Sequence, residues 1–286
     1  MASFFGMQVN RPILFDGAMG TELQKRGLSQ DPALLNISAP DDITAIHREY
    51  LAAGADILTT NTFGAYRHKY NNAVEIIQAA VSHGLRALNG QKNKWLALDI
   101  GPTGLMLEPY GETTAEECFQ IFKEAIHTGA ACGVDLILVE TMMDLTELAL
   151  AVNAAKETGL PVFATMSFDK NGVTMMGASI KDMVQTLENL GVYALGINCG
   201  FGPDVYTELA TRLSGISRRP IIVQPNAGMP VVSAPGPGAC TSVVRYDLTA
   251  EGFAKSMAKI DAEFIGGCCG TSPAHIKALA GYFGVM

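Results

Sequence analysis

Short apolar runs alternate with longer amphipathic stretches from one end of the chain to the other. The apolar runs predict eight strands, over residues 13–15, 56–60, 95–99, 136–139, 162–166, 194–197, 221–223 and 263–265. Runs without polar alternation are typical of parallel strands that are covered on both faces. The amphipathic stretches predict helices between the strands, over residues 41–54, 113–131, 144–159, 179–191 and 249–261.

Roughly eight strand–helix repeats of about 35 residues fill the chain without a linker or a low-complexity break. This rhythm predicts an α/β fold, a single-domain (β/α)8 TIM barrel, which typically needs about 250 residues. A doubly wound open sheet is the alternative. That fold ordinarily brings a phosphate-binding glycine turn between a strand and a helix, and the sequence shows none.

Polar and glycine-rich segments follow the predicted strands. They read Asp16-Gly17-Ala18-Met19-Gly20, Asn61-Thr62-Phe63-Gly64, Gly101-Pro102-Thr103, Glu140-Thr141, Asn198-Cys199-Gly200, Pro225-Asn226-Ala227-Gly228 and Cys268-Cys269. Strands that are buried on both faces have no structural need for such groups at one end. Because TIM barrels carry their active sites at the C-terminal ends of the strands, we expect the functional site at this rim.

Three cysteines stand at these strand ends, with Cys199 after the sixth strand and Cys268 and Cys269 after the eighth. Parallel strands would bring all three together over the barrel mouth. Three thiolates with a fourth position left open are typical of catalytic zinc. Neighbouring cysteines can share one metal only where the chain leaves β geometry, and the glycines around them permit this. For the other cysteines we favour simple packing or loop positions: Cys118, Cys132 and Cys240.

Two acids also stand at strand ends. Asp16 and Glu140 could hold the ammonium group of a substrate, while the backbone amides around Gly17 and Ala18 could receive its carboxylate. Together these groups would recognise an amino acid. The structural alternative is that each acid caps a helix or holds a neighbouring loop.

Composition narrows the range of partners. A net charge of -8 and a pI near 5.1 argue against nucleic acid and anionic membranes as partners. The longest apolar runs are too short to span a membrane, and no export signal is visible. Six cysteines are too few for a disulfide scaffold in a chain of this size. We therefore expect a cytoplasmic protein whose thiols bind metal or pack.

The motifs resemble those of the zinc-dependent homocysteine S-methyltransferase family over nearly the whole length. They are Asp16-Gly17-Ala18-Met19-Gly20-Thr21, Ala55-Asp56-Ile57-Leu58-Thr59-Thr60-Asn61-Thr62-Phe63, Val139-Glu140-Thr141, Gly196-Ile197-Asn198-Cys199 and Gly266-Gly267-Cys268-Cys269-Gly270-Thr271-Ser272-Pro273-Ala274-His275-Ile276. Within the family, the chain is most similar to the homocysteine-binding module of cobalamin-dependent methionine synthase. The Pro225-Asn226-Ala227-Gly228-Met229-Pro230 segment and Gly270 are in that module's style.

The resemblance implies that residues 1–286 form one homocysteine-binding barrel domain. It implies Zn²⁺ on the three strand-end cysteines, with the sulfur of homocysteine as the fourth ligand. Asp16 and Glu140 match positions that hold the amino group, and the backbone near Gly17 and Ala18 would receive the carboxylate. We expect Asn226, after the seventh strand, to cap the zinc when substrate is absent.

The implied reaction is methyl transfer to homocysteine, forming methionine. One barrel takes up all 286 residues, so we expect either an excised or naturally free module or a methyl donor that arrives on a separate corrinoid protein. The expected donor is methylcobalamin on such a protein. The Gly- and Pro-rich segment Met229 to Tyr246 could be a lid, a docking surface or an ordinary loop. Alternatives are a small donor such as S-methylmethionine, another thiol acceptor, or a zinc-dependent thiol-binding protein without turnover.

Overall fold

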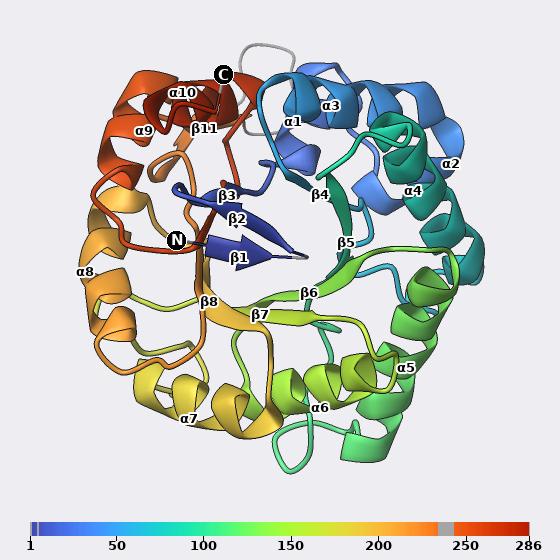
Figure 1. The fold of residues 1–286 in the computed structure, drawn as a ribbon. Helices are drawn as coiled ribbons and strands as arrows, with labels where there is room; N and C mark the ends of the chain where they lie inside the picture. The colour runs from blue at the N-terminus through green and yellow to red at the C-terminus, as the bar shows by residue number, and fades with distance from the viewer. Residues whose placement is uncertain (1, 5, 234–242, 286) are drawn as a thin grey trace.

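Eight parallel strands form a barrel that is surrounded by helices (Figure 1). The computed structural model describes residues 2–4, 6–233 and 243–285. The strands are hydrogen-bonded in the order β3-β12-β9-β8-β7-β6-β5-β4, and a parallel bridge between Phe15 and Ile57 joins β3 to β4. The prediction of a single-domain TIM barrel is confirmed.

The barrel strands are β3 (Ile13–Leu14), β4 (Ile57–Thr59), β5 (Trp95–Ile100), β6 (Leu136–Met142), β7 (Val162–Met166), β8 (Ala194–Asn198), β9 (Ile221–Gln224) and β12 (Phe264–Ile265). The helices are α1 (Met19–Lys25), α2 (Pro32–Ser38), α3 (Pro40–Ala52), α4 (Ala73–Leu88), α5 (Ala115–Ala131), α6 (Leu145–Lys156), α7 (Ile180–Leu190), α8 (Pro203–Ser214), α9 (Ala250–Met257) and α10 (Pro273–Tyr282). All eight predicted strands and all five predicted helices are present, with shifted ends.

Local sequence fixes several of the helix boundaries. A capping box of Thr114 and Glu117 begins α5, and Ser179 with Asp182 begins α7 in the same way. Helix α7 ends at Gly191, whose φ of 71° is in the left-handed region that glycine adopts most easily. These boundaries set where each connecting loop returns to the barrel.

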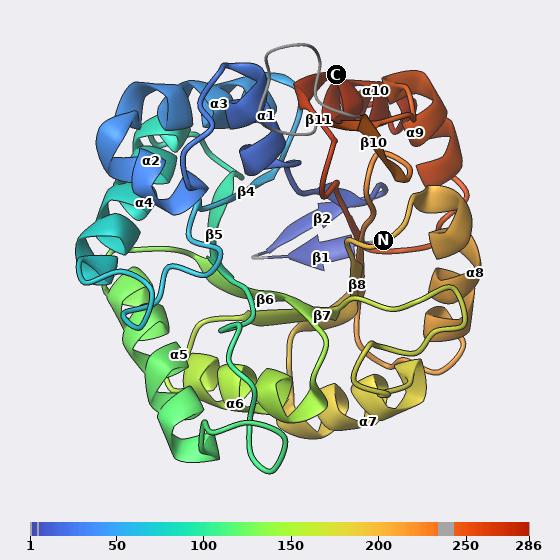
Figure 2. The ribbon, with the colours of Figure 1, turned by 180° about the vertical axis from the view of Figure 1, so that it is seen from behind.

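The N-terminal end of the barrel is closed by a short antiparallel hairpin that the sequence pattern did not predict. Strands β1 (Ala2–Phe4) and β2 (Met7–Val9) lie across this end of the barrel in Figure 1. The Phe4 ring is buried and packs edge-on against Trp95, Phe163 and Phe264, with centroid distances of 5.1, 5.7 and 5.5 Å. The opposite end, seen in Figure 2, is the C-terminal rim.

The segment Met229 to Tyr246 contains two strands, β10 (Pro230–Ser233) and β11 (Val243–Tyr246), which pair in antiparallel register. The β-branched sequence Val231-Val232 favours this pairing. The sequence alone leaves a lid, a docking surface and an ordinary loop open for this segment. Residues 234–242, which include Cys240, lie outside the described part of the chain.

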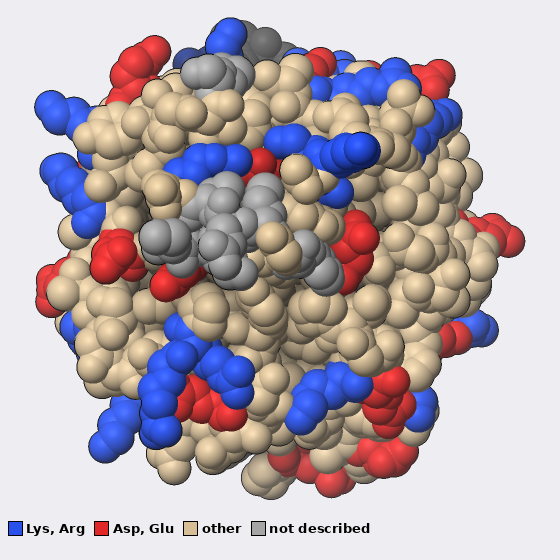
Figure 3. Space-filling model, in the orientation of Figure 1, with Lys and Arg blue, Asp and Glu red and all other residues tan. Residues whose placement is uncertain are grey.

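Basic and acidic side chains are intermixed over the face of the barrel that carries the hairpin (Figure 3). Every helix in the described ranges is too short or too polar to cross a lipid bilayer.

Candidate metal centre and substrate pocket

The barrel brings the three strand-end cysteines together. Cys199 directly follows β8, and Cys268 and Cys269 follow β12 after two glycines. The sulfur atoms of the three residues all lie within 4.8 Å of one another, and the Sγ atoms of Cys268 and Cys269 are 4.0 Å apart. No other cluster of metal-ligating side chains is found among the described residues.

The backbone leaves β geometry at the cysteines, as the sequence predicted. The Cys268 N–H donates to the carbonyl of Pro225 at 2.8 Å, and the Cys269 carbonyl accepts from the N–H of Ala227 at 2.9 Å. Both contacts tie the cysteine loop to the loop after β9. Cys199 itself has a φ of 61°, in the left-handed region that non-glycine residues rarely adopt. Such strain is commonly retained at functional sites.

The cysteine cluster fits a zinc ion. Tetrahedral coordination with Zn–S bonds of about 2.3 Å places sulfur atoms about 3.8 Å apart, close to the 4.0 Å between Cys268 and Cys269. Hydrogen bonds from the thiols of Cys199 and Cys268 lower the pKa of Cys269 to about 3. The hydrogen bond with Cys199 raises the pKa of Cys268. The thiols alone therefore favour one thiolate, and a divalent cation would let all three ionise.

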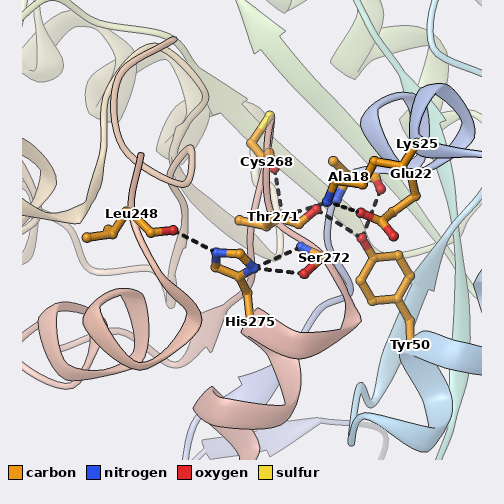
Figure 4. Close-up of polar contacts among 9 residues, drawn as sticks. All are labelled: Ala18, Glu22, Lys25, Tyr50, Leu248, Cys268, Thr271, Ser272 and His275. Atoms are coloured by element: carbon orange, nitrogen blue, oxygen red, sulfur yellow. Dashed lines mark hydrogen bonds and ion pairs between the residues drawn. The ribbon is translucent and has the colours of Figure 1, made fainter. Parts of the chain in front are cut away.

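A buried threonine joins the cysteine loop to the loop after β3. The hydroxyl of Thr271 donates to the Cys268 carbonyl at 2.7 Å and accepts from the N–H of Ala18 at 3.1 Å (Figure 4). Tyr50 adds a second link, since its hydroxyl donates to the Ala18 carbonyl at 2.8 Å. A Cβ on Gly17 would lie only 2.5 Å from the Thr271 hydroxyl, so a glycine is needed there.

A pocket of about 580 Å³ opens above the cysteines. The structure places Asp16, Gly17, Ala18 and Glu140 in its lining. Asp16 is held by the N–H of Thr59, which donates to its Oδ2 at 2.8 Å, and burial raises the pKa of this carboxyl to about 7. The pocket therefore combines a sulfur cluster with buried acids.

Glu140 faces the same pocket from β6. Burial is the main reason that its pKa is raised to about 8, and the charges of Cys269 and Asp16 add to the shift. Asn198 fixes its orientation by donating from Nδ2 to Oε2 of Glu140 at 3.2 Å. The Oδ1 of Asn198 in turn accepts from the Thr165 hydroxyl at 2.8 Å and from the N–H of Thr141 at 2.9 Å. Because Cys199 is the next residue, this network joins the acid to the sulfur cluster.

Three of the predicted site residues, Gly17, Ala18 and Asn226, differ in whether their polar groups have partners. The N–H of Ala18 is already bonded to Thr271, which leaves the N–H of Gly17 as the amide without a partner among the described residues. Asn226 is buried, and its Oδ1 has no hydrogen-bond partner in the described structure.

Several residues in or beside the pocket were not assigned a role from the sequence. Asn198 and Thr271 stand beside the predicted cysteines, so proximity in sequence was the available signal. Tyr246, at the end of β11, lines the pocket together with the cysteines. Asp99, in β5, also lines the pocket. The signal in the sequence was that alternate side chains of a barrel strand point into the barrel.

Known methionine synthases match nearly the whole chain. The methionine synthase of Mycobacterium tuberculosis is 33% identical over 298 residues, and that of Mycobacterium leprae is 34% identical over 300 residues. Each match covers 94% of this chain but only 24% of the relative, so the chain spans about a quarter of their length.

Solved structures of low identity share the fold. The metallated form of the homocysteine methyltransferase MmuM from Escherichia coli superposes with a TM-score of 0.78 at 23% identity, covering 95% of this chain and 96% of that chain. The profile of the homocysteine S-methyltransferase family matches residues 13–283. The chain therefore belongs to the homocysteine S-methyltransferase family.

Proposed function

We propose that the chain transfers a methyl group to the thiolate of homocysteine and forms methionine, with zinc held by Cys199, Cys268 and Cys269. The observation that carries this proposal is the cluster of three sulfurs within 4.8 Å, exposed to a pocket that also contains Asp16 and Glu140. Zinc bound there would supply a Lewis acid that keeps an incoming thiol deprotonated at neutral pH.

The chain's own residues position the amino acid. Asp16 and Glu140 accept hydrogen bonds from the substrate ammonium, and the free N–H of Gly17 is directed to the carboxylate, with Ala18 shaping the same loop. These contacts leave the substrate sulfur at the cysteine end of the pocket. The sulfur attacks the methyl carbon in line, and the donor retains the electron pair of the bond that breaks. In the substrate-free site, Asn226 would be the residue that caps the metal, since its Oδ1 has no hydrogen-bond partner in the described structure.

We infer that the donor is methylcobalamin carried by a separate corrinoid protein. The mycobacterial relatives are methionine synthases, which supports methionine synthesis by this chain. Residues 1–286 would then form a single barrel domain that binds homocysteine. Free cysteines at five described positions favour a reducing compartment such as the cytoplasm.

A donor assay tests this function. Zinc-loaded protein is incubated with homocysteine and with methylcobalamin, S-methylmethionine or betaine, and methionine is measured with and without a chelator. We expect chelator-sensitive methionine formation from methylcobalamin, and Cys268→Ala should abolish it. Formation only from S-methylmethionine would assign a small donor. Homocysteine binding without methyl transfer from any donor would overturn the enzymatic proposal in favour of a thiol-binding protein.

A further inference from the structure

The floor of the pocket contains a buried acid that nothing in the described structure neutralises. Asp99 is 6% exposed and lines the pocket, and its Oδ1 has no hydrogen-bond partner among the described residues. A buried carboxyl group without a partner is costly, so such a group usually has a ligand or a functional role. The hydrogen bonds of Asp99 in the described structure involve only its backbone, whose N–H donates to the Thr60 hydroxyl and whose carbonyl accepts from the Thr62 hydroxyl.

The barrel geometry aims Asp99 at the amino-acid site. Along β5, Ala97 belongs to the cluster inside the barrel, whereas Leu98 and Ile100 pack outward against the helices. Asp99 therefore points inward, one layer above Ala97. In the pairing of β5 with β6, Asp99 is opposite Leu138, so Glu140 is its diagonal neighbour on the same face.

Asp16 is the third acid of the pocket, and it lies on the opposite side of Asp99 from Glu140. The Thr59 N–H that holds the Asp16 carboxyl comes from β4, the strand that pairs with β5. The hydroxyl of Thr59 and the Oε1 of Gln224 are also buried without partners, and both residues line the same pocket. Oxygen atoms from several strands therefore line the floor of the same pocket.

We propose that Asp99 is a third acceptor for the ammonium group of the substrate and determines selectivity for thiols that carry an α-amino group. This inference rests on the proposed function. An ammonium group has three N–H donors, and Asp16, Glu140 and Asp99 supply three acceptors. Asp99 acts as a positioning residue, because the ammonium lies at the opposite end of the substrate from the reacting sulfur.

The test compares two ligands on the zinc-loaded protein by titration calorimetry. Homocysteine carries the amino group, and 4-mercaptobutanoic acid has the same thiol and carboxylate without it. We expect Asp99→Asn to weaken homocysteine binding at least about tenfold, as for a lost charge-assisted hydrogen bond, and to leave the desamino ligand unchanged. The control is Asp135→Asn, which removes an acid at the opposite end of β6 and should change neither affinity.

The outcomes separate this inference from the proposed function. Equal weakening of both ligands, or unchanged homocysteine binding, would overturn the role of Asp99 and indicate a buried water in its place. If wild-type protein binds neither ligand, the proposed function itself fails. Zinc content and the melting temperature are recorded for each variant, and Asp99→Ser provides a second substitution should Asp99→Asn not fold.

Discussion

The hydroxyl of Thr271 and the backbone N–H of Ala18 are hydrogen-bonded at 3.1 Å, although 253 positions separate them in the sequence. The same hydroxyl bonds the carbonyl of Cys268, so one side chain holds the cysteine loop against the loop after β3. The first and last strands of the barrel are thereby joined at the rim where both loops contribute to the site.

Replacing Thr271 tests this link. Thr271→Val keeps the shape but removes the hydroxyl, so the N–H of Ala18 and the carbonyl of Cys268 lose a buried partner. We expect the free energy of unfolding to fall by about 1–3 kcal/mol and zinc to dissociate faster. Thr271→Ser keeps the hydroxyl and should remain near wild type in zinc retention. Equal zinc retention in all three proteins would contradict the link.

The cluster of three sulfur atoms predicts which cysteines bind zinc. Cys199→Ala and Cys268→Ala each remove one of three sulfurs, and we expect most of the bound zinc to be lost on dialysis, as measured by elemental analysis. Cys132→Ala is the matched control, because Cys132 lies at the end of α5 outside the cluster. Full zinc in either cluster variant would show that the three-sulfur site is wrong.

Glu140 is expected to hold the substrate ammonium. Glu140→Gln keeps the size and the contact with Asn198 but removes the charge, so homocysteine affinity should fall about tenfold or more. Titration calorimetry on zinc-loaded protein measures the change. Glu157→Gln removes an acid at the surface and should bind as wild type does. Unchanged affinity in Glu140→Gln would remove this residue from the amino site.

Burial of Asp16 predicts a pH dependence of stability. Its pKa is about 7 in the folded protein and 3.8 as a model value, so the folded state holds this proton more tightly. The resulting stabilisation is present at low pH and is lost as the pH rises towards 7. Between pH 5 and pH 8, metal-free wild type should lose roughly 2 kcal/mol more unfolding free energy than Asp16→Asn. Urea unfolding measures both proteins, and parallel pH profiles would refute the assignment.

The barrel and its cysteines could be predicted because both depend on local pattern. Unbroken apolar runs indicate parallel strands, and once these strands form a barrel, residues at their C-terminal ends must meet. The proximity of Cys199 and Cys268 at this rim could therefore be predicted from their positions in the sequence alone. The hairpin that carries Phe4 is only a few residues long, and its stability comes from ring contacts with distant strands, which no local pattern reports.

The supporting groups of the site were harder to predict for a related reason. The contact of Thr271 with Ala18 and that of Asn198 with Glu140 depend on side-chain directions across different strands. Asp99 lies within an apolar run, where the sequence gives no sign that its carboxyl group lacks a partner. Such relationships appear only when tertiary packing is known.

We propose that the three cysteines hold a zinc ion and that the homocysteine sulfur becomes its fourth ligand. X-ray absorption at the zinc edge, recorded on zinc-loaded protein before and after homocysteine is added, counts the sulfur neighbours directly. We expect three sulfur neighbours without homocysteine and four with it. A sulfur count that does not change on saturation with homocysteine would contradict this proposal.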